Sequence, residues 1–276
     1  MLYRGIGMLV FEIKNGEEKR IQGYLFYFVK AEEFLVELDD SLDEWTAPLQ
    51  FSGSVKKGIY SISKNISRLW VEGRVVPVDR QNIGMILKNA GLKEYSVGKL
   101  LRITKGRCCQ DSDYLKEIKY ENLPNWVLER QKDNIRDCFW GSNNQVILLC
   151  ADDTVRSLSV EKLKECESKI EAMKCHQKIM QSVKVDIGGH GIVFSNGVAI
   201  DKTPLLQRAE VLPIKACNFY TFAKANLVHT TEACEILQCT RQNLAYLTKT
   251  KKLTPIHSLQ KENVYLKGDV ERSNWG

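Results

Sequence analysis

Four consecutive polar residues near the C-terminus carry side chains that proteins use to read base pairs. Thr240, Arg241, Gln242 and Asn243 are followed one turn later by Tyr246. An arginine can donate two hydrogen bonds to guanine, and a glutamine or asparagine can bond adenine in the same bidentate manner. If this run begins a helix, its side chains share an edge that can enter the major groove of duplex DNA.

Three lysines follow this edge and suit the phosphates of a nucleic-acid backbone. As an alternative, Arg241 and Gln242 are plain solvent-exposed residues on a helix of a protein-docking module. The candidate DNA-binding residues are Thr240, Arg241, Gln242, Asn243, Tyr246, Lys249, Lys251 and Lys252.

A first short helix must support the one that carries the polar edge. We expect it to begin at Thr230 or Thr231, with Ala233, Ile236 and Leu237 facing inward. Its three apolar positions lie on one side of a helix and can pack against a second one.

The second helix follows a turn at Gln238-Cys239. The Thr240 hydroxyl can accept a hydrogen bond from a free amide of the first turn and so cap the helix. Leu244 and Leu247 lie three residues apart and are expected to pack back on the first helix. Two strands over residues 253–256 and 263–266 then form a hairpin, and Lys267 starts a last helix.

This order of elements resembles the winged helix-turn-helix of the MerR and phage-excisionase group. The resemblance implies that the second helix reads duplex DNA while the first crosses its backbone. The hairpin loop carries Gln260–Asn263 where the group often has a glycine and several basic residues, so minor-groove contact by the hairpin is not implied. The matching residues are Thr230, Glu232, Ala233, Leu237, Cys239, Thr240, Arg241, Gln242, Leu244, Leu247, Lys249, Leu253, Pro255, Tyr265, Asp269 and Val270.

The charge of this C-terminal segment is modest. From His229 to Gly276 there are seven basic and five acidic residues, a net charge of +2, and the whole chain has +6. Because phosphate contacts depend on cations, tight binding would require a homodimer or basic residues from the rest of the chain. Reading of two symmetric half-sites also favours a homodimer.

A second distinctive region lies nearer the N-terminus. Arg74 and Arg80 could pair with Asp111 and Asp113 in a structural salt-bridge network, or the four could form a pocket or docking face for an anionic ligand or a partner protein. The surrounding stretches, residues 70–84 and 106–115, resemble a leader region of HipA-like kinases from Gram-positive bacteria. The phosphate loop and catalytic aspartates of those kinases have no counterpart, so kinase activity is not implied.

Alternating and branched residues predict an N-terminal α+β domain over residues 1–120. Strands are expected over 21–29 and 34–38. Asp79 should cap a helix that runs to Ala90 and stops at Gly91, and a shorter helix should span 96–103.

Two similar strand-rich units are expected over residues 121–222. Strands at 134–140, 145–150 and 154–158 precede a helix over 160–174. Strands at 183–187, 192–194 and 198–200 precede a helix that Thr203 caps, with Pro204 in its first turn. Each copy resembles a small bacterial domain whose role is not known, and pairing the two would close a core.

Composition narrows the class of protein. Hydrophobic residues make up 43% and charged residues 27% of the chain, which is typical of a globular protein, and no apolar run approaches the ~20 residues of a membrane span. Nine cysteines, an odd number without a Cys-x-x-Cys pair, favour reduced buried thiols in the cytoplasm over disulfides or a metal site.

We therefore expect an α+β, non-enzymatic DNA-binding protein without a cofactor, in which residues 223–276 form the winged helix-turn-helix. Transcriptional regulation of a bacterial or mobile-element operon is the leading use. The main alternative is an antitoxin-like or inhibitory protein that acts by binding a partner protein. A hydrolase in the strand-rich units is disfavoured, and it would be supported if acidic or histidine side chains converged in one pocket.

Overall fold

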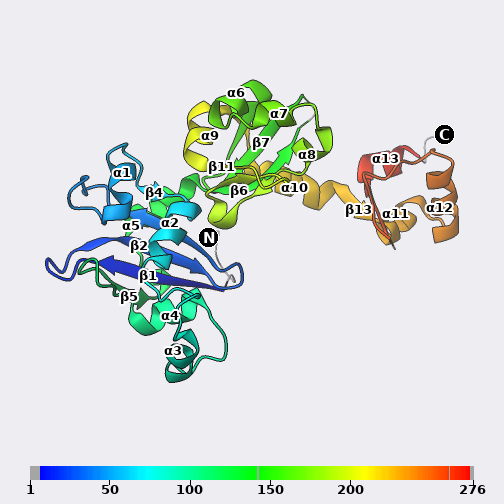
Figure 1. The fold of residues 1–276 in the computed structure, drawn as a ribbon. Coiled ribbons are helices and arrows are strands. Elements are labelled where there is room, and N and C mark those ends of the chain that lie inside the picture. The colour runs from blue at the N-terminus through cyan, green and yellow to red at the C-terminus, as the bar shows by residue number, and fades with distance from the viewer. Residues whose placement is uncertain (1–6, 142, 261, 274–276) are drawn as a thin grey trace. The chain divides into compact units, whose positions relative to one another are not determined.

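The structure is a computed structural model that describes residues 7–141, 143–260 and 262–273. It confirms the predicted α+β class, with several sheets and many short helices (Figure 1). The chain divides into two compact units. The first comprises Met1–Asp152 and Arg156–Val211, and the second comprises Asp153–Val155 and Leu212–Gly276. The domain limits expected after residues 120 and 222 fall inside the first and the second unit, respectively.

A five-stranded antiparallel sheet organises the N-terminal half of the first unit. The predicted strands at 21–29 and 34–38 are confirmed to within a residue. The strand order is β4-β3-β2-β1-β5. The strands are β1 (Met8–Lys14), β2 (Ile21–Phe28), β3 (Glu33–Leu38), β4 (Ser61–Ile62) and β5 (Tyr114–Ile118).

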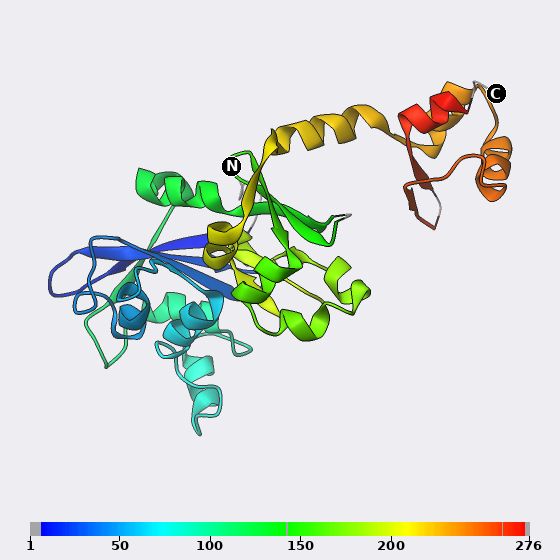
Figure 2. The ribbon, with the colours of Figure 1, turned by 90° about the horizontal axis from the view of Figure 1, so that it is seen from above.

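Helices cover both faces of this sheet, so β2 is buried at seven of its eight positions instead of alternating. Leu25 and Tyr27 pack with residues of α2 (Lys64–Glu72) and α4 (Val97–Thr104). The residues of β2 whose side chains lie on the opposite face of the sheet pack against α5 (Asn125–Arg130). Figure 2 shows α5 on one side of the sheet and α2 and α4 on the other.

Of two helices predicted in this half, one begins close to the expected residue and the other is shorter than expected. Ser96 caps α4 by accepting a hydrogen bond from the Lys99 amide, close to the predicted start. The helix expected from Asp79 is shorter: α3 (Ile83–Asn89) has Asn82 as its N-cap, so the predicted cap is wrong. The reason is a turn ahead of the helix, in which the Arg80 amide donates to Pro77 O. Gly91 has φ +68° and ends the helix as expected.

In the second half of the first unit, two runs of three strands each precede a helix, as predicted. The first run is β6 (Ile135–Trp140), β7 (Gln145–Cys150) and β8 (Thr154–Ser159), followed by α6 (Val160–Cys166). The second is β9 (Lys184–Val185), β10 (Gly191–Val193) and β11 (Ala199–Asp201), followed by α9 (Lys202–Arg208). The sheet orders are β12-β8-β7-β6, with β12 (Glu210–Lys215), and β11-β10-β9.

Two expectations about these helices are wrong. The helix predicted over 160–174 is broken, because Glu167 is extended and its carboxylate accepts a hydrogen bond from the Lys169 amide, which competes with the helix. The chain resumes as α7 (Ile170–Met173) and α8 (Gln177–Gln181). The N-cap of α9 is Asp201, not Thr203, although Pro204 does lie in the first turn.

In the described part of the first unit, the remaining short elements are one α-helix and four 3₁₀ turns. They are α1 (Ser52–Val55), η1 (Leu49–Phe51), η2 (Tyr120–Asn122), η3 (Gln131–Asp133) and η4 (Ile187–Gly189). Nowhere in residues 7–141, 143–260 and 262–273 is there a helix with the length and apolar character to cross a bilayer.

The second unit contains the two short helices predicted near the C-terminus. After α10 (Ala216–Asn226) come β13 (Leu227–His229), α11 (Thr230–Leu237), α12 (Arg241–Lys249), β14 (His257–Ser258), β15 (Asn263–Leu266) and α13 (Lys267–Arg272). The strands form one sheet in the order β13-β15-β14.

The first strand of the hairpin lies later than predicted. Residues 253–256 do not form a strand, and β14 occupies only His257 and Ser258. Pro255 has no amide hydrogen to donate, and the Ile256 amide donates to Val264 O just before β14 begins. The sequence also gave no signal for β13, which pairs with β15.

Candidate nucleic-acid interface

The N-terminus of α12 is shaped by local contacts. Gln238 takes a left-handed conformation with φ +50° and turns the chain after α11. Thr240 Oγ1 then accepts a hydrogen bond from the Asn243 amide at 3.3 Å, so the predicted cap is confirmed. Leu244 is buried against the core that includes Ala233, which fixes the rotation of α12 about its axis.

This rotation leaves the predicted polar edge in solvent. Tyr246 is 58% exposed, and each of the other candidates on α12 and in the turn after it is also exposed. The eight exposed residues are Thr240, Arg241, Gln242, Asn243, Tyr246, Lys249, Lys251 and Lys252. The structure therefore places them where a partner of the second unit can reach them.

Arg241 is oriented by the helix beneath it. Its Nη2 donates a hydrogen bond of 2.8 Å to Thr231 Oγ1, in the first turn of α11. The contact is exposed, so the guanidinium keeps most of its donors free for a ligand. A side chain held in this way loses less conformational freedom when it binds.

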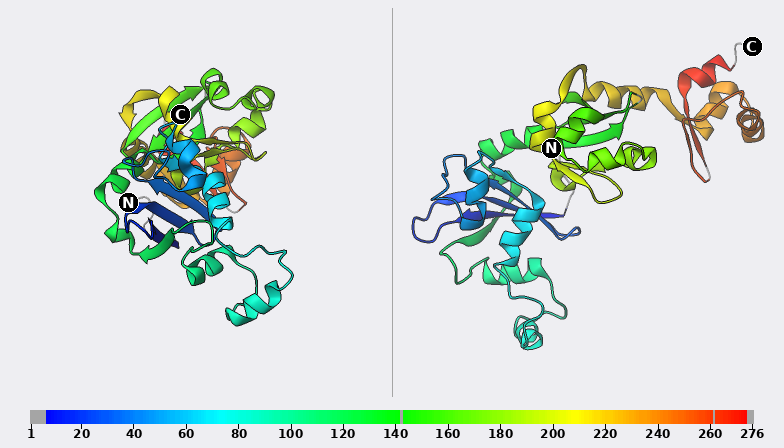
Figure 3. Two further views of the ribbon diagram at one scale, coloured as in Figure 1. Left: turned by 60° about the vertical axis from the view of Figure 1, so that its left-hand side comes forward. Right: turned by 45° about the horizontal axis from the view of Figure 1, so that its top comes forward.

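The hairpin is attached to both helices through its second strand. The Asn263 amide donates to Thr230 Oγ1 at 3.0 Å, and the Thr230 hydroxyl faces Asn263 O at 3.3 Å. The buried Tyr265 ring places its hydroxyl 3.0 Å from Thr248 Oγ1 on α12. Figure 3 shows the hairpin and α12 next to α11. Their relative position is thus set by hydrogen bonds as well as by the core.

A cavity of about 480 Å³ lies between α12 and the hairpin. Sequence reasoning did not include the hairpin residues among the candidates, because the loop lacks a basic cluster. Its lining combines one cation, one carboxylate and apolar carbon. The lining residues are Thr230, Arg241, Leu244, Ala245, Leu259, Gln260, Glu262, Asn263 and Tyr265. The spacing of Arg241 and Glu262 in the sequence does not indicate that both residues line one cavity.

Of the four residues predicted as a second site, three come together. Arg74 Nη2 lies 2.6 Å from Asp111 Oδ2 and 3.5 Å from Asp113 Oδ2. Its guanidinium also donates to Gly106 O at 3.0 Å and stacks 3.9 Å from the Trp70 ring centre. Arg80 is exposed and makes none of these contacts, so its predicted pairing with the carboxylates is wrong.

The geometry around Arg74 favours the structural interpretation of this network. The cavity beside it has only about 90 Å³, room for a few water molecules. Trp70 Nε1 and Arg74 Nε have no hydrogen-bond partner among the described residues, and such water can serve buried donors of this kind. Burial raises the pKa of the Asp113 carboxyl to about 6, with a further contribution from Asp111.

Acidic and histidine side chains also converge in the first unit, the arrangement that would support a hydrolase. Glu37 is fully buried, with Arg130 Nη1 at 3.1 Å and His190 Nε2 at 3.3 Å. The adjacent cavity, of about 440 Å³, is lined by Arg130 and Lys202 but not by Glu37 or His190. Burial, followed by the charge of Lys202, lowers the pKa of His190 well below 6.5. The pair is therefore a buried contact between the two halves of the unit, away from the cavity wall.

Comparisons with known proteins give no match: no family model, no curated protein and no solved structure is significantly similar to this chain.

Proposed function

We propose that the protein binds duplex DNA through its second unit, with residues 227–273 acting as a winged helix-turn-helix and α12 as its recognition helix. One observation carries the proposal: the apolar and the polar residues of the sequence pattern separate in space. The polar members Thr240, Arg241, Gln242 and Lys249 are exposed. The apolar members are buried in one core, namely Ala233, Leu244, Leu253, Tyr265 and Val270.

The chemistry of the exposed edge suits base reading. Arg241, Gln242 and Asn243 occupy the first turn of α12, the part of a recognition helix that contacts base edges. Lys251 and Lys252 follow the helix and are exposed, so they can reach phosphates. Good bidentate contacts discriminate by ~1–3 kcal/mol against a wrong base, whereas phosphate contacts add affinity without sequence preference.

The low net charge of +2 from His229 to Gly276 supports a homodimer on a site with two half-sites, about 34 Å apart or a multiple of this. We propose control of transcription, in a bacterial or mobile-element operon, as the use of this binding. The first unit would then sense a signal or hold the dimer together.

A protein-interaction role is the second candidate, because apolar side chains lie exposed beside the polar edge. Ile256 and Leu259 of the hairpin region are about half exposed, and so is Tyr246 on α12. Exposed apolar groups of this kind suit a protein partner better than a phosphate backbone. An antitoxin-like or inhibitory protein would use the same surface of the second unit to bind another protein.

The chain offers a matched control for testing the DNA-binding proposal. The tripeptide Arg-Gln-Asn occurs at 80–82 as well as at 241–243, and both copies are exposed. We would select duplexes from a random library with the full-length protein and measure affinity by fluorescence anisotropy at about 50 and 200 mM salt. Arg241→Ala/Gln242→Ala should bind the selected duplex ~10-fold or more weakly, and Arg80→Ala/Gln81→Ala should bind it as the wild type does.

The opposite results separate the two candidates. Failure to enrich any duplex, or an affinity that does not change with salt, would exclude specific DNA binding and favour the protein-interaction role. Equal binding of the selected duplex by wild type and Arg241→Ala/Gln242→Ala would show that α12 does not read the bases.

A further inference from the structure

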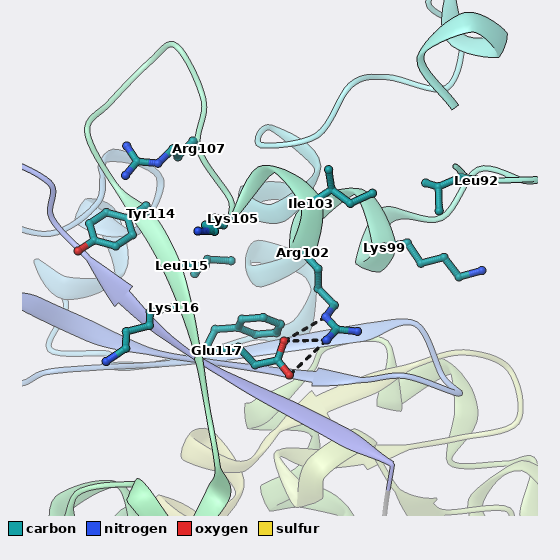
Figure 4. Close-up of a pocket in the computed structure, with 11 residues that line it drawn as sticks. Leu92, Lys99, Arg102, Ile103, Lys105, Arg107, Tyr114, Leu115, Lys116 and Glu117 are labelled. Carbon is teal, nitrogen blue, oxygen red and sulfur yellow. Dashed lines mark hydrogen bonds and ion pairs between the residues drawn. The ribbon is translucent and has the colours of Figure 1, made fainter. Parts of the chain in front are cut away.

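A cationic pocket of about 610 Å³ lies in the first unit between α4 and β5. Its volume falls within the ~300–1,000 Å³ that small-molecule sites occupy. Five of its lining side chains are cationic and one is anionic, a net charge of +4. The cations are Lys99, Arg102, Lys105, Arg107 and Lys116 (Figure 4).

Most of this charge is not neutralised within the pocket. Glu117 is paired with Arg102 at 3.0 Å. Lys99 and Lys116 form longer ion pairs, at 3.9 Å with Glu94 and at 3.8 Å with Glu12, and both carboxylates lie outside the lining. Lys105 and Arg107 have no carboxylate partner among the residues that the structure describes. Concentrated positive charge beside low-dielectric walls attracts anions.

The turn that joins α4 to β5 holds Lys105 in a conformation that residues with a Cβ disfavour. Lys105 has φ +54° and caps the C-terminus of α4, a position that glycine usually takes. The turn is held in place, because Lys105 O accepts a hydrogen bond of 2.7 Å from the Leu115 amide. Gly106 follows with φ +64°, and a Cβ there would come within 2.7 Å of the Leu115 side chain. The fold alone would accept glycine at 105, yet a lysine stands there and lines the pocket.

The pocket also has an apolar part. Phe11 and Leu115 are nearly fully buried beneath it, whereas Ile103 lines it with 54% of its surface exposed. Arg107 lies 4.9 Å from the centre of the Tyr114 ring. Figure 4 shows Lys105, Arg107 and Lys116 grouped around Tyr114, and Ile103 and Leu92 toward the other end. A ligand that fills this space therefore needs both negative charge and an apolar group.

We propose that this pocket binds a small polyphosphorylated molecule with a planar apolar group, the chemistry of a nucleoside di- or triphosphate. Arginine and lysine side chains are the usual partners of phosphate oxygens, and the base would cover Ile103 and the apolar floor. With a single carboxylate, already paired to Arg102, the lining has no cluster that would hold a divalent cation. The site binds the ligand's phosphates with its own charge, so Mg²⁺ is not required. This assignment does not depend on DNA binding by the second unit.

The test is isothermal titration calorimetry of the full-length protein with ATP, GTP and inorganic tripolyphosphate, in the presence of EDTA. A nucleotide should bind more tightly than tripolyphosphate, because only the nucleotide has a base. Lys105→Gly/Arg107→Gln should weaken binding of all three ~10-fold or more, since two charged contacts are lost. The control Lys56→Gln/Lys57→Gln removes the same charge from exposed residues outside the pocket and should bind as the wild type does.

A third variant separates the two parts of the ligand. Ile103→Asn should weaken binding of the nucleotide to the level of tripolyphosphate and leave tripolyphosphate itself unchanged. The nucleoside assignment is overturned if tripolyphosphate binds as tightly as the nucleotides. The whole site is overturned if none of the three ligands binds, or if Lys105→Gly/Arg107→Gln binds them like the wild type. Wild-type affinity of Lys105→Gly/Arg107→Gln for selected duplex DNA would show that the two sites are independent.

Discussion

Arg74 and Asp113 form an ion pair at 3.5 Å in which both side chains are at least 96% buried, and Asp111 shares the same guanidinium at 2.6 Å. One cation thus faces two carboxylates, so the arrangement cannot neutralise both. Burial and then the charge of Asp111 raise the pKa of Asp113 to about 6, against the opposing effect of Arg74. The network is a source of pH-dependent stability.

The first prediction concerns Asp113→Asn. The pKa of Asp113 is about 6 in the folded chain, above the ordinary aspartate value of 3.8. The folded state therefore binds more protons between these pH values, and its stability falls as pH rises through them. Wild type should gain about 1 kcal/mol in unfolding free energy from pH 7 to pH 5 through this group, and Asp113→Asn should lack that gain. Urea denaturation followed by tryptophan fluorescence measures the difference.

The comparison of the two proteins removes other titrations from the result. The pKa of His190 is lowered well below 6.5, so this residue destabilises the fold as pH falls through 6.5, the opposite direction. It does so equally in wild type and Asp113→Asn. If both proteins gave the same change between pH 7 and pH 5, the assignment of the raised pKa to Asp113 would be wrong.

The second prediction compares the contributions of Arg74 and Arg80 to the unfolding free energy. Arg74→Met leaves the buried Asp113 carboxylate and the more exposed Asp111 carboxylate without their cation and should reduce the unfolding free energy by about 3 kcal/mol. The loss should be smaller at pH 5, where Asp113 is protonated. Arg80→Met removes the same charge from an exposed side chain and should change the unfolding free energy by less than about 0.5 kcal/mol. Similar losses in both would contradict the structural role of Arg74.

The third prediction uses the backbone at the end of α12. Lys251 has φ +60°, which costs a residue with a Cβ about 1 kcal/mol. Lys251→Gly should therefore keep or raise the stability of the second unit, as measured by hydrogen exchange in α12. If Lys251 contacts a phosphate, then the slope of log affinity for duplex DNA against log salt should be smaller in magnitude by about 1 in Lys251→Gly than in the wild type.

Lys252→Gly is the control for this prediction. Lys252 is exposed and has a negative φ, so the same loss of charge should come with a loss of stability of about 0.5–1 kcal/mol. If Lys251→Gly were less stable than Lys252→Gly, the positive φ of Lys251 would not cost the fold stability. An unchanged salt slope in Lys251→Gly would show that Lys251 does not contact DNA.

The fourth prediction concerns the carboxylate in the cavity beside α12. Glu262 is 3.6 Å from His229 Nδ1 and lines the same cavity as Arg241. A DNA phosphate near the hairpin would be repelled by it, so Glu262→Gln should raise the affinity for duplex DNA ~3-fold, with a smaller effect at high salt. Glu271→Gln, on α13 and similarly exposed, should raise it less. Equal affinities of wild type and Glu262→Gln would place the hairpin outside the DNA contact.

Local chemistry predicted much of the second unit correctly. The Thr240 cap, the turn at Gln238-Cys239 and the start of α11 depend on residues within about four positions of one another, because helix caps and turns close over such distances. The same holds in the first unit for Ser96 and Gly91. Where a competing local bond existed, as between Glu167 and the Lys169 amide, the periodic pattern predicted a helix that the chain interrupts.

The cationic pocket could not be found from the sequence, although Lys99, Arg102, Lys105 and Arg107 lie close together along the chain. Their spacing is also that of a solvated helix surface and the turn after it. The pocket exists because β5 pairs with β1, about a hundred residues away, and this pairing places Lys116 and Tyr114 opposite α4.

The sequence by itself determined the strands β2 and β3, the two runs of three strands, and the two short helices near the C-terminus. It also determined the Thr240 cap and the burial of Ala233 and Leu244. Tertiary structure alone decided that Arg74 and not Arg80 meets the two carboxylates, that Glu262 shares a cavity with Arg241, and that five cations surround one pocket. Each of these contacts joins residues far apart in the chain or in different elements. Local propensity does not specify such contacts, because they form only when sheet pairing and core packing bring the elements together.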